Sequence, residues 1–370
     1  MPLPRIFADL LSLPTATFVE SAVKAYVQDF CRRTPGVSLK NDRYGNLLVR
    51  YRRRPRGTVP LVFSAHMDHP GFVAREMLDE HTLRAAFRGG VIDDYFANAK
   101  VWFQSGSERV RGKVLEVTKV KKLARGPVTW KIPEEAILRV SGPVKPNSPG
   151  MWDLPEAHER GGNVYGRDCD DIAGCAAMLE LLRRLTRKNA RAEVYCLFTR
   201  AEEVGFIGAI GAAKAGTVSK QWPLIAIETS SELPNARIGD GPILRVGDRM
   251  SVFHPGVTAF CGRVAQRLAK RRKTFQFQRK LMDGGSCEST AFCAYGYLAT
   301  GICLALGNYH NMDKAKQTLA CEFVSLSDWR QMVDWFEALA TDETGYRPDD
   351  PAVRDDLDKL FARWLLLLKG

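Results

Sequence analysis

The stretch Pro60-Leu-Val-Phe-Ser-Ala65, followed directly by His66-Met-Asp68, decides the predicted fold. Its first six residues form a short, nearly continuous apolar run, which is typical of a strand buried on both faces of a parallel sheet. His66 and Asp68 then fall at the carboxyl end of this strand. In open α/β sheets the ligand site lies beyond the carboxyl ends of the strands. We therefore expect functional side chains at this point.

Helical and strand patterns alternate along most of the remaining sequence. This alternation predicts an α/β fold, with a mostly parallel sheet flanked by helices on both faces. The expected helices are 16–33, 172–185, 206–214, 262–270 and one from 290, and the further expected strands are 47–51, 193–199, 224–228, 274–278 and 301–306.

One region departs from this pattern. From about residue 82 to 162 short β-type runs are separated by glycine, proline and charged residues, which favours a small β-rich domain inserted into the larger one. The predicted organisation is an α/β catalytic domain at 1–78 and 163–343, an inserted β-rich domain at 79–162, and a C-terminal helical extension at 344–370.

The composition is that of a globular protein, with 370 residues, 45% hydrophobic and 26% charged. No run reaches the roughly 18 apolar residues that a membrane span needs. The first ten residues do not resemble a signal peptide, so a cytoplasmic location is expected. The nine cysteines are scattered without a Cys-x-x-Cys pair, which predicts reduced thiols, most of them in the core.

The net charge is +12 and is concentrated in 50–56, 183–188 and 270–273. Such charge could attract nucleic acid or acidic peptides. The three clusters lie in separate segments with few aromatic residues between them, which favours solvated faces over a nucleic-acid site.

Imidazole and carboxylate groups follow four predicted strands, and a further acidic cluster precedes a predicted helix. These groups are a ligand set for zinc, cobalt or manganese. The adjacent residues Glu202 and Glu203 should point in different directions, so that one can bind metal while the other reaches a water. Alternatively, the two glutamates cap the helix that follows them. The clusters contain His66 with Asp68, Asp170 with Asp171, Glu202 with Glu203, Glu228, and His310.

Two of these clusters have further interpretations. Asp68 is placed to accept the free ring N–H of His66 or to hold this ring indirectly. Asp170 and Asp171 could cap the helix that starts near Ile172, and a cap does not exclude a ligand.

The order of these motifs resembles the glutamyl aminopeptidase family of metallopeptidases, which includes the tetrahedral TET aminopeptidases. The similarity extends over roughly residues 8–340. It rests on Ser64-Ala-His-Met-Asp-His-Pro-Gly71, Gly166-Arg-Asp-Cys-Asp-Asp-Ile-Ala-Gly-Cys175, Thr199-Arg-Ala-Glu-Glu-Val-Gly-Phe-Ile-Gly208, Asp42-Arg-Tyr-Gly-Asn-Leu47, Gly239-Asp-Gly-Pro242, Gly284-Gly-Ser286 and Asn308-Tyr-His310.

The resemblance implies a hydrolase with two divalent metal ions per chain, acting on peptides as a homo-oligomer. In the family pattern, His66 and Glu203 are ligands of separate metals, and Asp170 bridges them. Glu228 and His310 complete the two spheres. Asp68 orients His66, and Glu202 is the general base. The two metal ions would activate a water and polarise the scissile carbonyl.

Four positions depart from the family pattern. Glu228 stands where the family usually carries Asp, and in related two-zinc peptidases Glu there is common in carboxypeptidases and deacylases. His69 with Pro70, and Ile172, replace the family's usual residues beside the centre. A two-metal carboxypeptidase or N-acyl amino acid deacylase therefore stays open beside an aminopeptidase. A non-catalytic metal- or nucleic-acid-binding protein is the alternative of another class, although Glu202 would be unnecessary there.

The C-terminal segment from about Thr344 lies beyond the resemblance. Its apolar residues, among them Leu357, Leu360 and Trp364, fit one face of a helix. This face could dock on its own domain or contribute to an oligomer contact.

Overall fold

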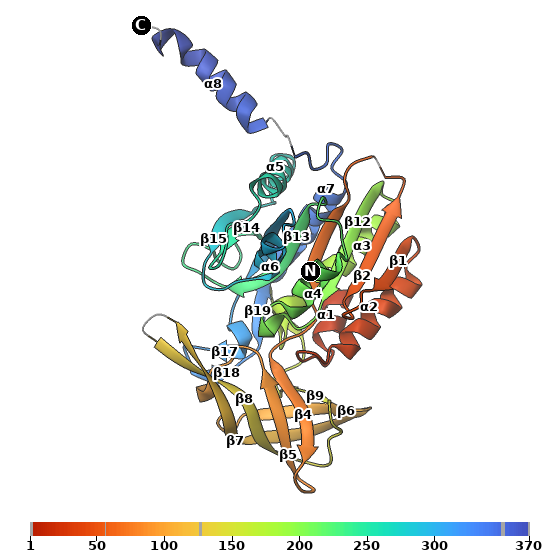
Figure 1. The fold of residues 1–370 in the computed structure, drawn as a ribbon, viewed down its shortest axis with the longest axis vertical. Helices are drawn as coiled ribbons and strands as arrows, with labels where there is room; N and C mark the ends of the chain where they lie inside the picture. Colours follow the sequence, from red (N-terminus) through yellow and green to blue (C-terminus); the bar gives the residue numbers. More distant parts are fainter. Residues whose placement is uncertain (1–2, 56, 126–127, 349–351, 369–370) are drawn as a thin grey trace.

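The computed structural model describes residues 3–55, 57–125, 128–348 and 352–368. A large sheet with helices on both faces forms the main body (Figure 1). A β barrel is attached at one end of this body, and the last helix projects from the other. The structure thus contains an α/β body, a β barrel and a C-terminal helix.

The main sheet has eight strands in the order β1-β2-β12-β3-β13-β16-β14-β15. The four central strands, β12, β3, β13 and β16, run parallel to one another. β2 pairs antiparallel with β12, and β14 antiparallel with β16, so the sheet is mixed. Its four central strands are parallel, and β14 and β15 at one edge run parallel to each other. The strands are β1 (Val37–Asn41), β2 (Leu47–Arg53), β3 (Leu61–His66), β12 (Ala192–Thr199), β13 (Leu224–Ser231), β14 (Ile243–Asp248), β15 (Gln278–Met282) and β16 (Ala299–Leu306).

Alternate side chains of β3 enter two different cores, as the two-residue period of a strand requires. Phe63 and Ala65 pack with α3, α5 and α7, whereas Val62 packs with α4 and α6 on the other face. The helices are α1 (Arg5–Leu11), α2 (Ser21–Arg33), α3 (Cys169–Arg187), α4 (Ile207–Ala215), α5 (Pro255–Arg271), α6 (Glu288–Ala294), α7 (Leu326–Ala340) and α8 (Ala352–Leu368).

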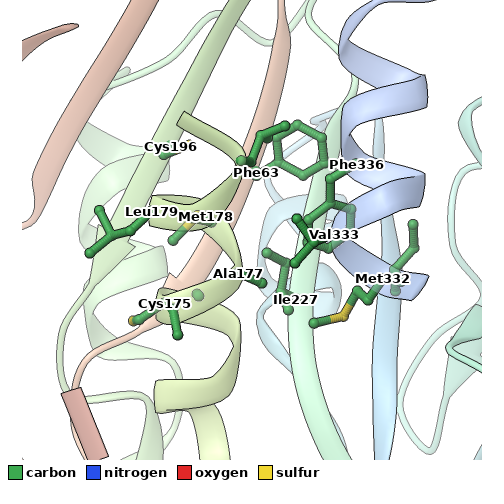
Figure 2. Close-up of a cluster of buried hydrophobic side chains, with 14 of the residues drawn as sticks. Phe63, Cys175, Ala177, Met178, Leu179, Cys196, Ile227, Met332, Val333 and Phe336 are labelled. Atoms are coloured by element: carbon green, nitrogen blue, oxygen red, sulfur yellow. The ribbon is translucent and has the colours of Figure 1, made fainter. Parts of the chain in front are cut away.

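The larger core lies where α3 and α7 pack side by side on the sheet (Figure 2). Figure 2 shows the rings of Phe63 and Phe336 in contact, and their centroids are 4.8 Å apart. Small residues such as Ala177 let α3 approach the strands closely. This packing holds the start of α3 against the carboxyl ends of the central strands.

The insertion is a closed barrel in the order β4-β5-β8-β7-β6-β9. Phe72, Phe87, Phe96 and Trp152 contact one another in its interior, with ring centroids 4.8–5.9 Å apart. Its strands are β4 (Gly71–Met77), β5 (Thr82–Arg88), β6 (Lys100–Ser105), β7 (Glu108–Arg125), β8 (Val128–Val140) and β9 (Pro149–Trp152).

Smaller elements connect the barrel to the main body. β11 pairs with both β10 and β19, and β17 pairs with β18. These strands are β10 (His158–Arg160), β11 (Asn163–Gly166), β17 (Met312–Asp313), β18 (Thr318–Leu319) and β19 (Glu322–Ser325), and short 3-10 helices occur at Asp93–Tyr95, Glu202–Val204 and Tyr309–Asn311.

Three details differ from the expectations. The helix expected at 16–33 begins only at Ser21. The barrel begins at Gly71 rather than at 79, because β4 pairs with both β5 and β9. The strand expected at 274–278 begins only at Gln278. Phe275 and Phe277 instead pack their rings near Trp335 of α7, so tertiary packing overrides the β-propensity of this segment.

The cysteines are free thiols, and all but Cys293 are buried, as expected. Among the described residues, no helix is both long and apolar enough to cross a membrane.

Candidate metal and peptide site

The predicted functional residues gather at the carboxyl ends of the central strands. His66 is the last residue of β3, which lies between the parallel strands β12 and β13. β12 ends at Thr199 and leads into Glu202 and Glu203, while β13 carries Glu228. Because parallel strands end at the same edge of a sheet, these residues meet there.

Histidine and carboxylate groups form three overlapping clusters among the described residues. Two of them share Asp170: one contains His66, Asp170 and Glu228, and the other contains Asp170, Glu203 and His310. The third contains His66, Glu202 and Glu203, and within each cluster the candidate ligand atoms lie within 4.8 Å of one another. His66 Nε2 is 3.4 Å from Asp170 and 3.7 Å from Glu228. His310 Nε2 is 3.2 Å from Glu203 and 3.8 Å from Asp170.

The two aspartates at the start of α3 have different tasks. Asp171 Oδ1 accepts a hydrogen bond from the backbone N–H of Gly174, which is a capping interaction. Asp170 turns its carboxylate toward both histidines. The peptide bond between them is cis. The structure therefore assigns cap and candidate ligand to separate residues.

The adjacent glutamates also separate, as expected. Glu203 faces His310, whereas Glu202 Oε2 lies 4.0 Å from His66 Nε2. Neither caps the following helix α4, whose N-cap is Phe206 and shows no side-chain cap bond.

Asp68 holds the loop that carries the glutamates rather than the ring of His66 directly. Its Oδ1 accepts the backbone N–H of Glu202 at 2.9 Å, and its Oδ2 accepts the Thr17 hydroxyl at 3.0 Å and the Glu203 N–H at 3.3 Å. His66 Nδ1 instead lies 3.0 Å from the Asp68 backbone carbonyl, and 3.6 Å from the carboxylate, which is too long for a hydrogen bond.

The second histidine is oriented by the barrel. His310 Nδ1 lies 3.0 Å from the carbonyl oxygen of Gly90, which follows β5. Donation of the Nδ1 proton to this carbonyl leaves Nε2 free to face Glu203 and Asp170. His310 itself has a φ of 54°, an unusual backbone conformation for a residue with a side chain.

Burial dominates the electrostatics of the site. It raises the pKa of Glu202 and of Glu228 well above the usual range, with neighbouring carboxylates adding to the effect. Burial alone would lower the pKa of His66, but nearby carboxylates, above all Asp170, outweigh it and raise this pKa. The buried carboxylates of the site thus outnumber its two histidines, so an added positive charge is stabilised there.

Unpaired atoms point to the same conclusion. His66 Nε2, Asp170 Oδ1 and Glu203 Oε1 are buried without a hydrogen-bond partner in the described structure. Buried polar atoms are normally paired, because an unpaired one costs roughly 1–3 kcal/mol. Imidazole and carboxylate atoms left free in this way fit divalent transition metals.

A cleft of about 690 Å³ opens over these residues. The carboxylates Asp170, Glu202, Glu203 and Glu228 line it on the side of the sheet. The opposite wall comes from the barrel and from the long β7–β8 hairpin, and its lining includes Arg75, Arg88, Lys119 and Lys121. The cleft is large enough for a short peptide.

The sequence reasoning missed Glu322 and the supporting contact of His69. Glu322 accepts the backbone N–H groups of both Asp170 and His310, at 3.0 and 2.8 Å. His69 Nδ1 lies 2.8 Å from the Asp170 carbonyl. Glu322 is a lone acidic residue in the short strand β19, and the sequence around it gave no other indication of its role.

Two of the three basic clusters meet in the structure. Arg184 of the first and Arg272 of the second both pair with Asp334 of α7, and residues of both clusters line one pocket. Arg50 of the third cluster pairs with Glu193 of β12.

Comparisons with known proteins agree with this geometry. Residues 143–317 match the family described as M42 glutamyl aminopeptidase. A protein of Acetivibrio thermocellus named "Putative aminopeptidase" is 27% identical over 265 residues, which are 68% of this chain and 74% of that protein.

Two solved structures share the fold over nearly the whole chain. The TET1 peptidase of Pyrococcus horikoshii, which can assemble into a tetrahedron or a large octahedral shell, has a TM-score of 0.73 and 21% identity, over 91% of this chain and 98% of its own. An aminopeptidase of Desulfurococcus kamchatkensis has a TM-score of 0.72 and 21% identity, over 91% and 93%. The motif resemblance is confirmed, and the chain is a peptide hydrolase similar to the M42 glutamyl aminopeptidases.

Proposed function

We propose that the chain is a metalloaminopeptidase that removes N-terminal residues from short peptides with the help of two divalent ions. The observation that carries this proposal is the pair of ligand clusters joined by Asp170. His66, Asp170 and Glu228 would hold one ion, and Asp170, Glu203 and His310 the other. Zinc suits these ligands best, and cobalt or manganese are the alternatives.

Bound ions would lower the pKa of a water and polarise the scissile carbonyl. The protein supplies the proton transfer. Glu202 takes the proton of the attacking water and delivers it to the leaving amine. Its burial, which raises its pKa, suits a group that must both accept and return a proton. Asp68 is a positioning residue, because it fixes the backbone of Glu202.

The charge distribution of the cleft favours an aminopeptidase. Four carboxylates line its sheet side around the ligand clusters, where Arg245 and Arg249 also occur, and its barrel side carries Arg75, Arg88 and Lys121 together with Glu134. A short peptide would match both walls with its N-terminal amine toward the carboxylates and its C-terminal carboxylate toward the barrel. The presence of Glu228 keeps one second candidate, a two-metal carboxypeptidase or N-acyl amino acid deacylase.

The two candidates differ in their need for a free amine. The purified protein should be assayed on matched dipeptides that carry a free or an acetylated N-terminus. Cleavage of the free-amine substrates supports the aminopeptidase. Cleavage of the acetylated substrates alone would reject it in favour of the deacylase or carboxypeptidase.

The base assignment needs a variant that keeps the ions. Glu202→Gln should retain two ions per chain by elemental analysis and lose at least 100-fold in kcat, whereas the exposed Glu116→Gln should match the wild type. Unchanged hydrolysis by Glu202→Gln would refute the mechanism. The cytoplasmic location, the homo-oligomer and the lack of a nucleic-acid partner stay predictions from the sequence.

A further inference from the structure

Two arginines on the outer face of the barrel line the cleft without a carboxylate partner. Arg75 of β4 and Arg88 of β5 both belong to the cleft wall, and so does the small residue Ala86 of β5. Within the described residues, no carboxylate forms an ion pair with either arginine. Burial and the positive charge of Arg75 lower the pKa of Arg88. A bound anion would relieve this repulsion.

A β-bulge places Arg75 in the cleft wall. β4 and β5 pair antiparallel, and their register shifts between Ala74 and Glu76, so Arg75 is the extra residue. Bulges re-aim a side chain and are frequent beside active sites. The next residue, Glu76, pairs with Arg84 of β5. Arg75 is exposed and keeps its charge for a ligand in the cleft.

Arg88 is held by contacts that leave donors available. Its Nη1 donates to the carbonyl oxygen of Thr17 at 2.9 Å, and its guanidinium carbon lies 4.9 Å from the centroid of the Phe18 ring. The charge of Glu20 also acts on Arg88, but the Glu20 carboxylate accepts a hydrogen bond from Arg200 at 2.8 Å. Because a guanidinium has five N–H donors in a planar fork, Arg88 can still bind a carboxylate.

The backbone after Arg88 leads directly to the metal ligands. Two residues further on, the carbonyl oxygen of Gly90 lies 3.0 Å from His310 Nδ1. Gly89 has a φ of 122°, and a Cβ there would lie 2.5 Å from Pro70. The Cα of Arg88 is therefore within about 7 Å of the Cα of Gly90. An extended peptide of about two to four residues spans roughly 7–14 Å, which matches an anchor this close to the centre.

We propose that Arg88, together with Arg75, binds the C-terminal carboxylate of the substrate, so that the chain prefers peptides of a few residues with a free C-terminus. This assignment rests on the proposed aminopeptidase, whose ligand clusters receive the other end of the peptide. The planar guanidinium fork suits a carboxylate, which it can bind with two parallel hydrogen bonds. On the facing hairpin Lys119 already pairs with Glu134 at 2.9 Å.

Peptides that differ only at the C-terminus test the anchor. The wild type should cleave a tripeptide with a free carboxylate at a kcat/KM roughly 10-fold or more above that of its C-terminal amide, mainly through KM. Arg75→Ala should reduce this advantage. Arg75→Ala/Arg88→Ala should abolish it, while cleavage of the amide stays as in the wild type. Arg84→Ala, on the same strand but paired with Glu76, should keep the advantage.

Peptide length separates a terminal anchor from a general attraction of negative charge. The advantage of the free carboxylate should shrink as the peptide grows from about three to about six residues, because its terminus then extends past the arginines. An advantage that is independent of length, or that survives in Arg75→Ala/Arg88→Ala and disappears in Lys121→Ala or Arg249→Ala, would overturn the proposal.

Binding without hydrolysis separates this inference from the proposed function. Calorimetric titration of Glu202→Gln should show tighter binding of the free carboxylate than of the amide, and Glu202→Gln/Arg75→Ala/Arg88→Ala should bind both alike. Equal binding of both peptides to Glu202→Gln would overturn the anchor and leave the aminopeptidase intact. Absence of peptide hydrolysis by the wild type would refute the proposed function, whereas the titration alone decides the anchor. An amidated peptide with an internal glutamate that regains the advantage through the two arginines would assign them to a side-chain carboxylate instead.

Discussion

The Asp68 carboxylate accepts the backbone N–H of Glu202 at 2.9 Å, and this contact ties the strand that ends in His66 to the loop that carries the proposed base. Asp68 is fully buried and has three donors around it. The precision of the centre therefore depends on a carboxylate that need not contact the substrate.

Asp68→Asn should lower kcat by roughly 10- to 100-fold, the usual range for residues that orient metal ligands. The amide retains only one acceptor oxygen for three donors, so the Glu202 loop should shift. Steady-state kinetics checks this, with the exposed Asp94→Asn as the control. A KM change with normal kcat would contradict a positioning role.

Gly90→Ala should weaken metal binding with little loss of stability. A Cβ at this position would lie 3.2 Å from His310 Nδ1 and 3.3 Å from Cε1, so the imidazole must give way. Gly142→Ala is a matched control, because a Cβ there meets nothing within 4 Å. Titration of the metal-free protein with zinc, followed by calorimetry, gives the affinity. Equal affinities in the two variants would show that the barrel does not orient His310.

Removal of metal should destabilise the protein, because buried carboxylates would lose their compensating charge. Ions bound at about 100 times their Kd contribute roughly 2.7 kcal/mol. We expect a chelator to lower Tm by several degrees and zinc, cobalt or manganese to restore it. The double variant His66→Ala/His310→Ala should no longer respond, and a chelator effect of the same size in this variant would exclude the proposed centre.

Phe336→Ala should cost about 3–5 kcal/mol in the free energy of unfolding, as expected when a large core residue is removed. The ring of Phe336, a residue of α7, is fully buried and packs against Phe63 of β3. Denaturant unfolding measures the change. Leu78→Ala, at a position that is 46% exposed, should cost far less. Similar losses in both would show that α7 adds little to the core.

Glu180 provides a pH-dependent contribution to stability. Burial raises its pKa, but hydrogen bonds from Arg183 and Arg184 outweigh burial and lower the pKa below its usual value of 4.5. A lowered folded-state pKa stabilises the protein above the unfolded value, and this contribution disappears as pH falls through the folded value. Glu180→Gln should therefore lower Tm more at pH 7 than at pH 4. A difference independent of pH would contradict this linkage.

The sequence predicted those parts of the fold that depend on periodicity. The run before His66 and the helix that became α3 have strong patterns, so their place in the sheet and core followed. The segment around Phe275 did not, because its aromatic side chains pack on α7 in a loop conformation, and no local pattern records such long-range contacts.

The sequence pattern likewise located some residues of the candidate site and not others. His66, Asp170 and Glu203 lie at strand or helix ends that the pattern locates. The Glu322 carboxylate accepts the backbone N–H groups of Asp170 and His310, and Gly90 supplies its backbone carbonyl. The sequence does not show where such backbone groups point.

The support of His310 by Gly90 and Glu322 bears on how the protein is made. The groups that complete the centre lie between positions 66 and 322, on both sides of the barrel. A growing chain on the ribosome cannot close this centre until β19 has emerged and the barrel has folded. We therefore expect a nascent chain that stops before β19 to lack peptide hydrolysis.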